Sequence, residues 1–267
     1  MAAPLLLIGA GRMGGALLKG WLARGLGPVV VVETNPSPEL KRLARRAVTL
    51  LKNTDDAPAK LRACVIALKP QILKTEAAKL KAIASSGVPV ISIAAGSSIG
   101  MMTKAWGKSA RIIRAMPNTP GSIGEGISAL YAPRNATRAD RKLAESLLAA
   151  LGQTVWVKHE TDIDTVTAVS GSGPAYVFLM VECLAAAGRK EGLPADVALK
   201  LARQMVIGAG ALLKADPAPA EELRRNVTSP HGTTEAALKV LMAKNGMAPL
   251  IKRAISAARK RAKQLSK

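Results

Sequence analysis

The sequence predicts an α/β protein, with a mostly parallel sheet covered by helices in residues 1–160 and an all-helical domain in residues 161–267. Two observations lead to this prediction. Before residue 160, short apolar runs with the composition of buried strands alternate with amphipathic helical segments, as in parallel sheets covered on both faces. After residue 160, strand signals stop and helical periodicity continues. The length of 267 residues is sufficient for both domains.

The strands and helices of the first domain follow from apolar runs and from helical spacing. Apolar or β-branched runs predict strands at 4–8, 29–33, 64–68, 90–93, 111–116 and 127–131. Apolar residues spaced by three and four predict helices at 13–24, 38–47, 72–84, 99–106 and 137–151. The last of these begins at Thr137, whose hydroxyl suits an N-cap.

The second domain consists of helices that often begin near a proline and end near a glycine. We expect helices at 161–168, 174–190, 194–214, 220–226, 233–245 and 247–266. The helix at 174–190 has apolar side chains around nearly its whole circumference, which requires burial. A domain of this size has little interior to bury such a helix, so we expect a homodimer through this domain.

Composition narrows the class of protein. Aromatic residues make up 2% of the chain, so the core must be built from Ala, Leu, Val, Ile and Met. We expect no apolar stretch to reach the length of a membrane span. Cys64 and Cys183 lie in apolar periodic stretches and predict buried, reduced thiols in a cytoplasmic protein. His159 and His231 lie far apart in the sequence, which gives no spacing typical of a metal site.

The formal net charge of +21 has two interpretations. A strongly basic chain can bind nucleic acid or attract anionic small molecules. It can also expose a solvated basic helix face, since the densest basic run lies at 252–263. Stacking aromatics do not interleave with these charges, so we favour the solvated face and expect no nucleic-acid partner.

The segment Gly9-Ala10-Gly11-Arg12-Met13-Gly14 has the full G-x-G-x-x-G pattern between a predicted strand and a predicted helix. In a dinucleotide site the first glycine permits the tight turn, the second admits the pyrophosphate, and the third packs helix on strand. Its position in the first β-turn-α unit predicts a Rossmann-like domain. We expect the cofactor to contact Gly9, Ala10, Gly11, Arg12 and Met13.

Glu33 ends the second predicted strand, where a Rossmann-like domain contacts the ribose. A carboxylate there hydrogen-bonds a 2′-hydroxyl and repels a 2′-phosphate. The neutral donors of Thr34, Asn35 and Ser37 could instead hold a phosphate, and Glu33 could point to solvent. The choice between NADH and NADPH therefore stays open.

Three later strands end in small or proline-bounded loops, at the edge where open α/β sheets bind ligands. These loops are Lys69-Pro70, Ala94-Ala95-Gly96 and Met116-Pro117-Asn118-Thr119-Pro120. They line the nicotinamide or form ordinary turns, since each also has the composition of a turn. We expect further cofactor contacts from Asn35, Asn53, Lys69, Pro70, Ala95, Gly96 and Asn118.

Two small, hydroxyl-rich segments in the second domain each precede an apolar helical run. They are Ser170-Gly171-Ser172-Gly173-Pro174-Ala175-Tyr176 and Ser229-Pro230-His231-Gly232-Thr233-Thr234. The start of a helix has free N–H groups and a positive dipole end, which favour a small anion. With a dinucleotide site upstream, these segments indicate a nicotinamide enzyme that acts on a small carboxylate.

These motifs, in this order, resemble those of the pyrroline-5-carboxylate reductases over nearly the whole chain. The resemblance implies NAD(P)H-dependent reduction of 1-pyrroline-5-carboxylate to L-proline, the last step of proline biosynthesis. It also implies a helical domain that interlocks two subunits, often with higher assembly of the dimers.

The resemblance further implies roles for single residues. Thr234 matches the position of a catalytic hydroxyl near the ring nitrogen, and Ser229 helps to position the loop. We expect free N–H groups of Gly232, Thr233 and Thr234 to hold the substrate carboxylate. His231 stands where the family usually has a glycine. It is either a cationic neighbour of that carboxylate or a tolerated variant that points away, and we favour the second interpretation.

Two other functions are compatible with parts of the sequence. A β-hydroxyacid dehydrogenase has the same domain order but uses a catalytic lysine after a Gly-rich segment, and residues 170–180 contain no lysine. A non-catalytic nucleotide-sensing or RNA-binding protein would use the basic tail at 252–267. It predicts retained cofactor binding, no imine reduction and a nucleic-acid affinity that falls with salt.

Overall fold

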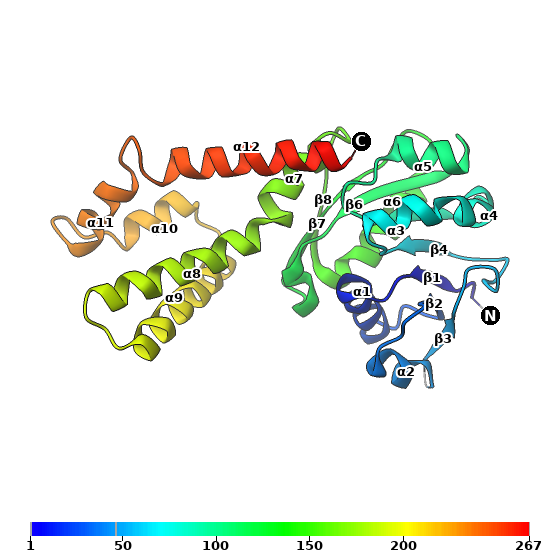
Figure 1. Ribbon diagram of the computed structural model, residues 1–267, viewed down its shortest axis with the longest axis horizontal. Helices are drawn as coiled ribbons and strands as arrows, with labels where there is room; N and C mark the ends of the chain where they lie inside the picture. The colour runs from blue at the N-terminus through cyan, green and yellow to red at the C-terminus, as the bar shows by residue number, and fades with distance from the viewer. Residues whose placement is uncertain (1, 46, 267) are drawn as a thin grey trace. The chain divides into compact units, whose positions relative to one another are not determined.

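The computed structural model describes residues 2–45 and 47–266 of the chain. The chain divides into one compact unit of Met1–Ser172 with Ala258–Lys267, and a second unit of Gly173–Ala257. The first unit contains an eight-stranded sheet covered by helices, and the described elements of the second are all helices (Figure 1). The predicted α/β class, with a Rossmann-like sheet followed by a helical domain, is confirmed.

The strands of the sheet are β1 (Leu5–Ile8), β2 (Val29–Val32), β3 (Val48–Leu51), β4 (Ala63–Ile66), β5 (Pro89–Ser92), β6 (Arg111–Met116), β7 (Gly126–Tyr131) and β8 (Gly152–Trp156). Their order in the sheet is β3-β2-β1-β4-β5-β6-β7-β8. Neighbouring strands run parallel except β6 and β7, which are antiparallel. The strand order reverses beside β1, and open α/β sheets bind ligands at such a point.

Helices cover both faces of the sheet because the central strands are apolar on both sides. In β1, Leu5 and Leu7 face one core, whereas Leu6 and Ile8 face the other. Helices α1 (Arg12–Ala23), α2 (Pro38–Ala44) and α6 (Arg138–Leu148) pack on the first core. Helices α3 (Pro70–Glu76), α4 (Lys81–Ser85) and α5 (Ile99–Trp106) pack on the second (Figure 1).

A buried tryptophan joins two elements on each face of the sheet. The indole N–H of Trp21 in α1 donates to the carbonyl oxygen of Leu147 in α6 at 2.8 Å. The indole N–H of Trp106 in α5 donates to the carbonyl oxygen of Ala77 at 2.7 Å. A buried N–H without an acceptor destabilises a fold, so each tryptophan needs this hydrogen bond. Each bond also fixes the position of one helix relative to another.

Two strands, β3 and β8, were not predicted from the sequence. Both are edge strands and both are partly exposed, so neither has the continuous apolar run by which the other strands were predicted. The predicted helix at 72–84 is divided into α3, a 3-10 turn at Ala77–Leu80 and α4. The predicted helix at 38–47 ends at Ala44, and position 46 lies outside the described residues.

The remaining helices are α7 (Asp162–Val166), α8 (Gly173–Lys190), α9 (Ala195–Ala215), α10 (Ala220–Asn226), α11 (Thr233–Leu241) and α12 (Met247–Leu265). A π-helical turn at Thr167–Gly171 joins α7 to α8, so Asp162–Lys190 is one helix of 29 residues. By length and composition this helix could cross a membrane. The expectation that no apolar stretch has this length is wrong, because the π turn joins two segments that small residues separate in the sequence.

Large apolar side chains on α8 and α9 are exposed in the single chain. Phe178 is 62% exposed, and Leu179, Leu201 and Ile207 are each more than half exposed. The two helices pack on each other, and these side chains remain uncovered. Because monomers rarely expose so much apolar surface, the helical unit needs a partner surface. A second copy of the chain would provide it, in agreement with the predicted homodimer.

Candidate active site

The three glycines of the turn between β1 and α1 have three different surroundings. Gly9 has a φ of +89°, and a Cβ there would lie 2.9 Å from the carbonyl oxygen of Ala67. A Cβ on Gly14 would lie 2.1 Å from the carbonyl oxygen of Gly9, so the helix packs on the turn without room for a side chain. A Cβ on Gly11 would meet nothing within 4 Å. Gly11 therefore faces open space, as the approach of a pyrophosphate requires.

The start of α1 leaves backbone amides available to an anion. Gly11 is the N-cap residue and makes no side-chain cap. The N–H of Gly15 donates to the carbonyl oxygen of Gly11 at 2.7 Å, and the amides between them have no helical acceptor. A cavity of about 470 Å³ lies beside this turn, and Ala10, Ser37 and Ser122 are among the residues that line it. These features fit the pyrophosphate of a dinucleotide.

The predicted residues Arg12 and Met13 differ in what they offer at this turn. Arg12 is exposed and lines the cavity. Met13 is partly buried and packs on the core of the sheet, so its backbone N–H rather than its side chain is available to a ligand.

Glu33 lies directly after β2, and both of its carboxylate oxygens accept hydrogen bonds. Oε2 accepts from the N–H of Ala10 at 2.8 Å, and Oε1 accepts from the N–H of Asn35 at 3.0 Å. The carboxylate therefore braces the Gly-rich turn and does not simply point to solvent. The hydroxyl of Ser37 accepts from the N–H of Leu40 at 3.1 Å and caps α2.

The other predicted cofactor residues follow the carboxyl ends of parallel strands, on the same edge of the sheet as the Gly-rich turn. Asn53 follows β3, and its side-chain oxygen accepts from the N–H groups of Asp55 and Asp56 at 3.0 and 3.3 Å. Lys69 follows β4 as the N-cap residue of α3, whose first residue is Pro70. The fold thus brings these residues to the ligand-binding edge.

The loops after β5 and β6 complete this edge. Ala95 and Gly96 follow β5 and are partly buried. Asn118 follows β6, and its side-chain oxygen accepts from the N–H of Ile127 in β7 at 2.9 Å. The side-chain oxygen of Asn118 therefore fixes the loop, and its carbonyl oxygen accepts from the N–H of Gly121 at 3.0 Å, so the side-chain amide nitrogen remains for a ligand.

A charged pair that was not predicted lies beside the loop that follows β5. Arg114 lies in β6 with 3% of the residue exposed, and its Nη1 donates to Oε1 of Glu160 at 3.1 Å. The same oxygen accepts from the N–H of Ile99 at 2.7 Å. The position of Arg114 inside an apolar strand could have indicated this pair, because a buried arginine requires a partner.

The segment before α11 forms a tight turn and a helix start. The N–H of Gly232 donates to the carbonyl oxygen of Ser229 at 3.1 Å, so the expectation that this amide is free is wrong. Gly232 is the N-cap residue of α11 and makes no side-chain cap. The amides of Thr233 and Thr234 lie in the first turn, where a helix offers no acceptor.

His231 has a φ of +58°, in the left-handed region that glycine adopts most readily. This conformation explains why a glycine suits the position and why histidine is strained there. The N–H of His231 donates to Oε2 of Glu235 at 2.6 Å, and Nζ of Lys239 lies 3.3 Å from Oε1 of Glu235. Glu235 therefore stabilises the turn from within α11.

The segment at 170–174 differs from its prediction. The hydroxyl of Ser170 donates to the carbonyl oxygen of Val166 at 3.1 Å. The N–H of Ser172 donates to the carbonyl oxygen of Thr167 at 2.8 Å. These bonds belong to a continuous helix, so the expected helix start with free amides is wrong. A Cβ on Gly171 would lie 2.7 Å from Cε of Met116, which places this segment against the end of β6.

The predicted thiols have different surroundings. Cys64 in β4 is buried, and burial raises the pKa of its thiol to about 12, so it is a neutral core residue. Cys183 on α8 is exposed in the single chain, contrary to prediction, because it lies on the helix whose apolar side chains are uncovered.

Within the described residues, no group of three or more His, Cys, Asp or Glu could hold a metal ion.

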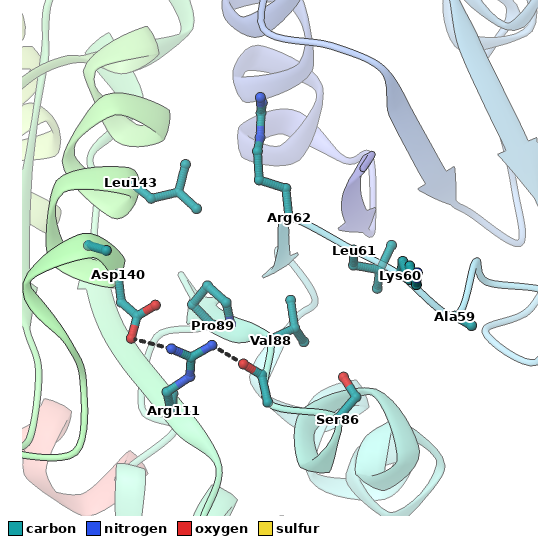
Figure 2. A pocket seen from close by; sticks show the side chains of 12 residues that line it. Ala59, Lys60, Leu61, Arg62, Ser86, Val88, Pro89, Arg111, Asp140 and Leu143 are labelled. Atoms are coloured by element: carbon teal, nitrogen blue, oxygen red, sulfur yellow. Dashed lines mark hydrogen bonds and ion pairs between the residues drawn. The ribbon is translucent and has the colours of Figure 1, made fainter. Parts of the chain in front are cut away.

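A cavity of about 430 Å³ lies at the opposite edge of the sheet, where β4, β5 and β6 begin. Figure 2 shows Arg111 in its wall, paired with Asp140 at 3.1 Å between Nη1 and Oδ2. Arg111 also donates to the carbonyl oxygen of Gly87. The predicted site residues are not among those that line this cavity, and open sheets bind ligands at the other edge, so we assign it no part in the site.

Known families match both parts of the chain. Residues 160–265 match the family described as pyrroline-5-carboxylate reductase dimerisation, and residues 5–96 match that described as NADP oxidoreductase, coenzyme F420-dependent. The chain is 36% identical to a pyrroline-5-carboxylate reductase of Pseudomonas aeruginosa, over 100% of this chain and 98% of that protein. It is also 36% identical to one of Pisum sativum, over 97% of this chain and 94% of that protein.

Two solved structures share the fold over nearly their whole length. A pyrroline-5-carboxylate reductase of Coxiella burnetii has a TM-score of 0.91 and 36% identity, covering 100% of both chains. The pyrroline carboxylate reductase of Plasmodium falciparum, solved with NADP bound, has a TM-score of 0.83 and 28% identity, covering 99% of this chain and 98% of that one. The chain therefore belongs to the pyrroline-5-carboxylate reductase family, as its motifs predicted.

Proposed function

We propose that the chain reduces 1-pyrroline-5-carboxylate to L-proline with NADH or NADPH, by hydride transfer to the imine carbon. The observation that carries this proposal is the 36% sequence identity to pyrroline-5-carboxylate reductases along the full length of the chain. The Gly-rich turn agrees with it, because Gly11 faces open space at an uncapped helix start.

The cofactor would lie along the carboxyl edge of the sheet. The amides at the start of α1 would hold the pyrophosphate, and Glu33 would face the ribose beside the turn that it braces. The loops that contain Lys69, Ala95 and Asn118 would line the nicotinamide. When bound, the reduced cofactor supplies the hydride, and the protein contributes orientation and a dry pocket.

The substrate carboxylate would be held at the start of α11. The amides of Thr233 and Thr234 and the positive end of the helix dipole favour an anion there. Gly232 would shape the turn, since its own N–H already donates to Ser229. Ser229 in turn supplies the carbonyl oxygen that closes the turn.

The reaction adds a hydride to the imine carbon and a proton to the ring nitrogen, while the C=N double bond becomes a single bond. The hydroxyl of Thr234 would hydrogen-bond this nitrogen and favour its protonated form, which accepts a hydride more readily. Residues 170–174 would form part of the wall of the site, and Gly171 in this segment lies next to Met116 at the end of β6.

We further propose that residues 1–160 act as the cofactor domain and that residues 161–267 interlock two subunits, with dimers assembling further. The exposed apolar side chains of α8 and α9 support an extensive interface in this region. A reducing, cytoplasmic location fits the two unpaired cysteines, Cys64 and Cys183.

The test is an assay of the purified chain with 1-pyrroline-5-carboxylate and either NADH or NADPH. We expect consumption of the reduced cofactor to equal the L-proline formed, as measured by nicotinamide absorbance and by mass spectrometry. Cofactor binding without imine reduction would contradict the proposal and favour the nucleotide-sensing alternative.

A further inference from the structure

The last helix of the chain ends against the loop that follows β5. Helix α12 belongs to the helical unit up to Ala257, and its end, from Ala258, belongs to the sheet unit. A Cβ on Gly96 would lie 3.0 Å from the carbonyl oxygen of Leu265, and Gly96 has a φ of +70°. Glycine suits position 96 for two reasons: the backbone has a positive φ, and the close approach of α12 leaves little room for a side chain.

A series of polar contacts connects the end of the chain to the start of α5. The hydroxyl of Ser266 lies 3.2 Å from Oδ1 of Asp164. This oxygen lies 3.9 Å from Nη2 of Arg114, whose Nη1 donates to Oε1 of Glu160. The same oxygen of Glu160 accepts from the N–H of Ile99, the first residue of α5. The contacts therefore reach the residue that directly follows the loop.

Burial holds these groups in fixed positions. The side chain of Arg114 is 4% exposed, whereas those of Glu160 and Asp164 are 28% and 13% exposed. A buried guanidinium needs acceptors close by, because an unpaired buried charge is strongly unfavourable. Arg114 thus fixes the carboxylate of Glu160, which in turn fixes the first amide of α5. The loop is held at its exit by the hydrogen bond from Ile99 to Glu160, and the end of α12 packs closely against it at Gly96.

We propose that Arg114, Glu160, Asp164 and the chain end at residues 265–266 are positioning residues for the nicotinamide half of the cofactor. They act by holding the backbone of the loop at residues 94–98. The proposal rests on the proposed function, in which this loop lines the nicotinamide. NAD(P)H affinity therefore depends on residues 265–266, although the Gly-rich turn binds the other half of the cofactor.

The test shortens the chain and separates the two halves of the cofactor. A chain that ends at Gln264 is compared with the full chain for binding NADH, NADPH, ADP-ribose and 2′-phospho-ADP-ribose, by calorimetry without substrate. The last two probes contain no nicotinamide. We expect the dissociation constants of the reduced cofactors to rise about tenfold, and those of the two ADP-ribose probes to stay within about twofold.

A second variant leaves the chain end in place. Glu160→Gln keeps an oxygen that can accept the N–H of Ile99 but removes the charge opposite Arg114, and we expect the same selective loss, by about threefold to tenfold. Gln264→Ala, which alters an exposed side chain on the same helix, is the matched control and should bind all four probes as the full chain does.

Two results would overturn the proposal. One is unchanged NADH and NADPH affinity in both the shortened chain and Glu160→Gln. The other is equal weakening of all four probes, which would indicate a general loss of structure. Since no 1-pyrroline-5-carboxylate is present in these measurements, their result does not depend on whether the chain reduces that imine.

Discussion

Glycine meets two separate requirements in the turn after β1. Gly14 has no space for a side chain, because a Cβ would lie 2.1 Å from the carbonyl oxygen of Gly9. Gly11 has open space around the position of a Cβ. The first requirement belongs to the packing of the domain, and the second belongs to the ligand.

This difference predicts that the same substitution lowers stability at one position and cofactor affinity at the other. Gly14→Ala should destabilise the fold by about 1–3 kcal/mol, because the methyl group overpacks the turn. Gly11→Ala should change stability by less than about 1 kcal/mol but raise the NAD(P)H dissociation constant about tenfold or more, since its methyl group would meet the pyrophosphate. Thermal unfolding and cofactor titration of both variants check this. Equal losses of stability would contradict it.

The hydroxyl of Thr234 is the side-chain group to which we assign a step of the reaction. Thr234→Ala should lower kcat about 100-fold while the NAD(P)H dissociation constant stays the same, because the hydroxyl meets the ring nitrogen and not the cofactor. Thr234→Ser should keep most of the activity. The neighbouring Thr233→Ala is the control and should have a small effect on kcat. A loss of cofactor affinity with normal kcat would show that the role is wrongly assigned.

The positions of these residues could be predicted from the sequence, whereas most of their hydrogen bonds could not. The G-x-G-x-x-G pattern predicted the turn, because a glycine requirement is local. The direction of Glu33 could not be predicted, because its bond to the N–H of Ala10 joins residues that lie 23 positions apart. Likewise, the bond from Gly232 to Ser229 depends on the shape of a turn that composition alone leaves open.

Among the elements, buried polar contacts fix the junction between β6 and α6. Oδ2 of Asp140 accepts from Nη1 of Arg111 at 3.1 Å and from the N–H of Thr137 at 2.9 Å. The hydroxyl of Thr137 accepts from the N–H of Asp140, which completes a capping box at the start of α6. The same carboxylate thus caps a helix and joins it to a strand.

The burial of this carboxylate predicts a measurable effect on stability. Asp140→Asn should lower the free energy of unfolding by about 1–3 kcal/mol, because its side chain is 6% exposed and serves two donors. The control is Glu221→Gln, which removes the i,i+4 pair with Arg225, where both side chains are more than 60% exposed. It should change stability by less than about 0.5 kcal/mol. Urea unfolding at one protein concentration checks both, and equal effects would refute the argument.

Elements with strong periodicity could be predicted, whereas those defined by tertiary pairing could not. Val29–Val32 is a continuous β-branched run and was predicted within one residue. Gly152–Trp156 became a strand because it pairs with β7 at the edge of the sheet, which a partly exposed sequence does not reveal. Ser170 to Gly173 look like a loop in sequence, but a π turn keeps them inside a helix.

For the whole molecule, the uncovered apolar side chains of α8 and α9 predict an obligate partner surface. Phe178→Asp should convert a dimer into a monomer or greatly weaken it, because a charge would be placed in the apolar interface. Val155→Asp, on the partly exposed edge strand β8, is the control and should leave the dimer intact. Sedimentation velocity checks this. A dimer that tolerates Phe178→Asp but not Val155→Asp would place the interface elsewhere.

The order of the two domains followed from the change in periodicity near residue 160, and the helical unit follows the sheet as expected. The return of residues 258–266 to the sheet unit could not be predicted, because a basic helix gives no sign of where its end packs. The buried Arg114 indicates part of this packing, since its guanidinium requires acceptors, and these come from residues far along the chain.

The binding of the substrate carboxylate by the first amides of α11 is the central claim, and a crystal structure of the chain with NADP⁺ and L-proline tests it most directly. We predict that the proline carboxylate lies within about 3 Å of the backbone nitrogens of Thr233 and Thr234. Proline held with its carboxylate on other groups, while those two amides bind only solvent, would contradict the account.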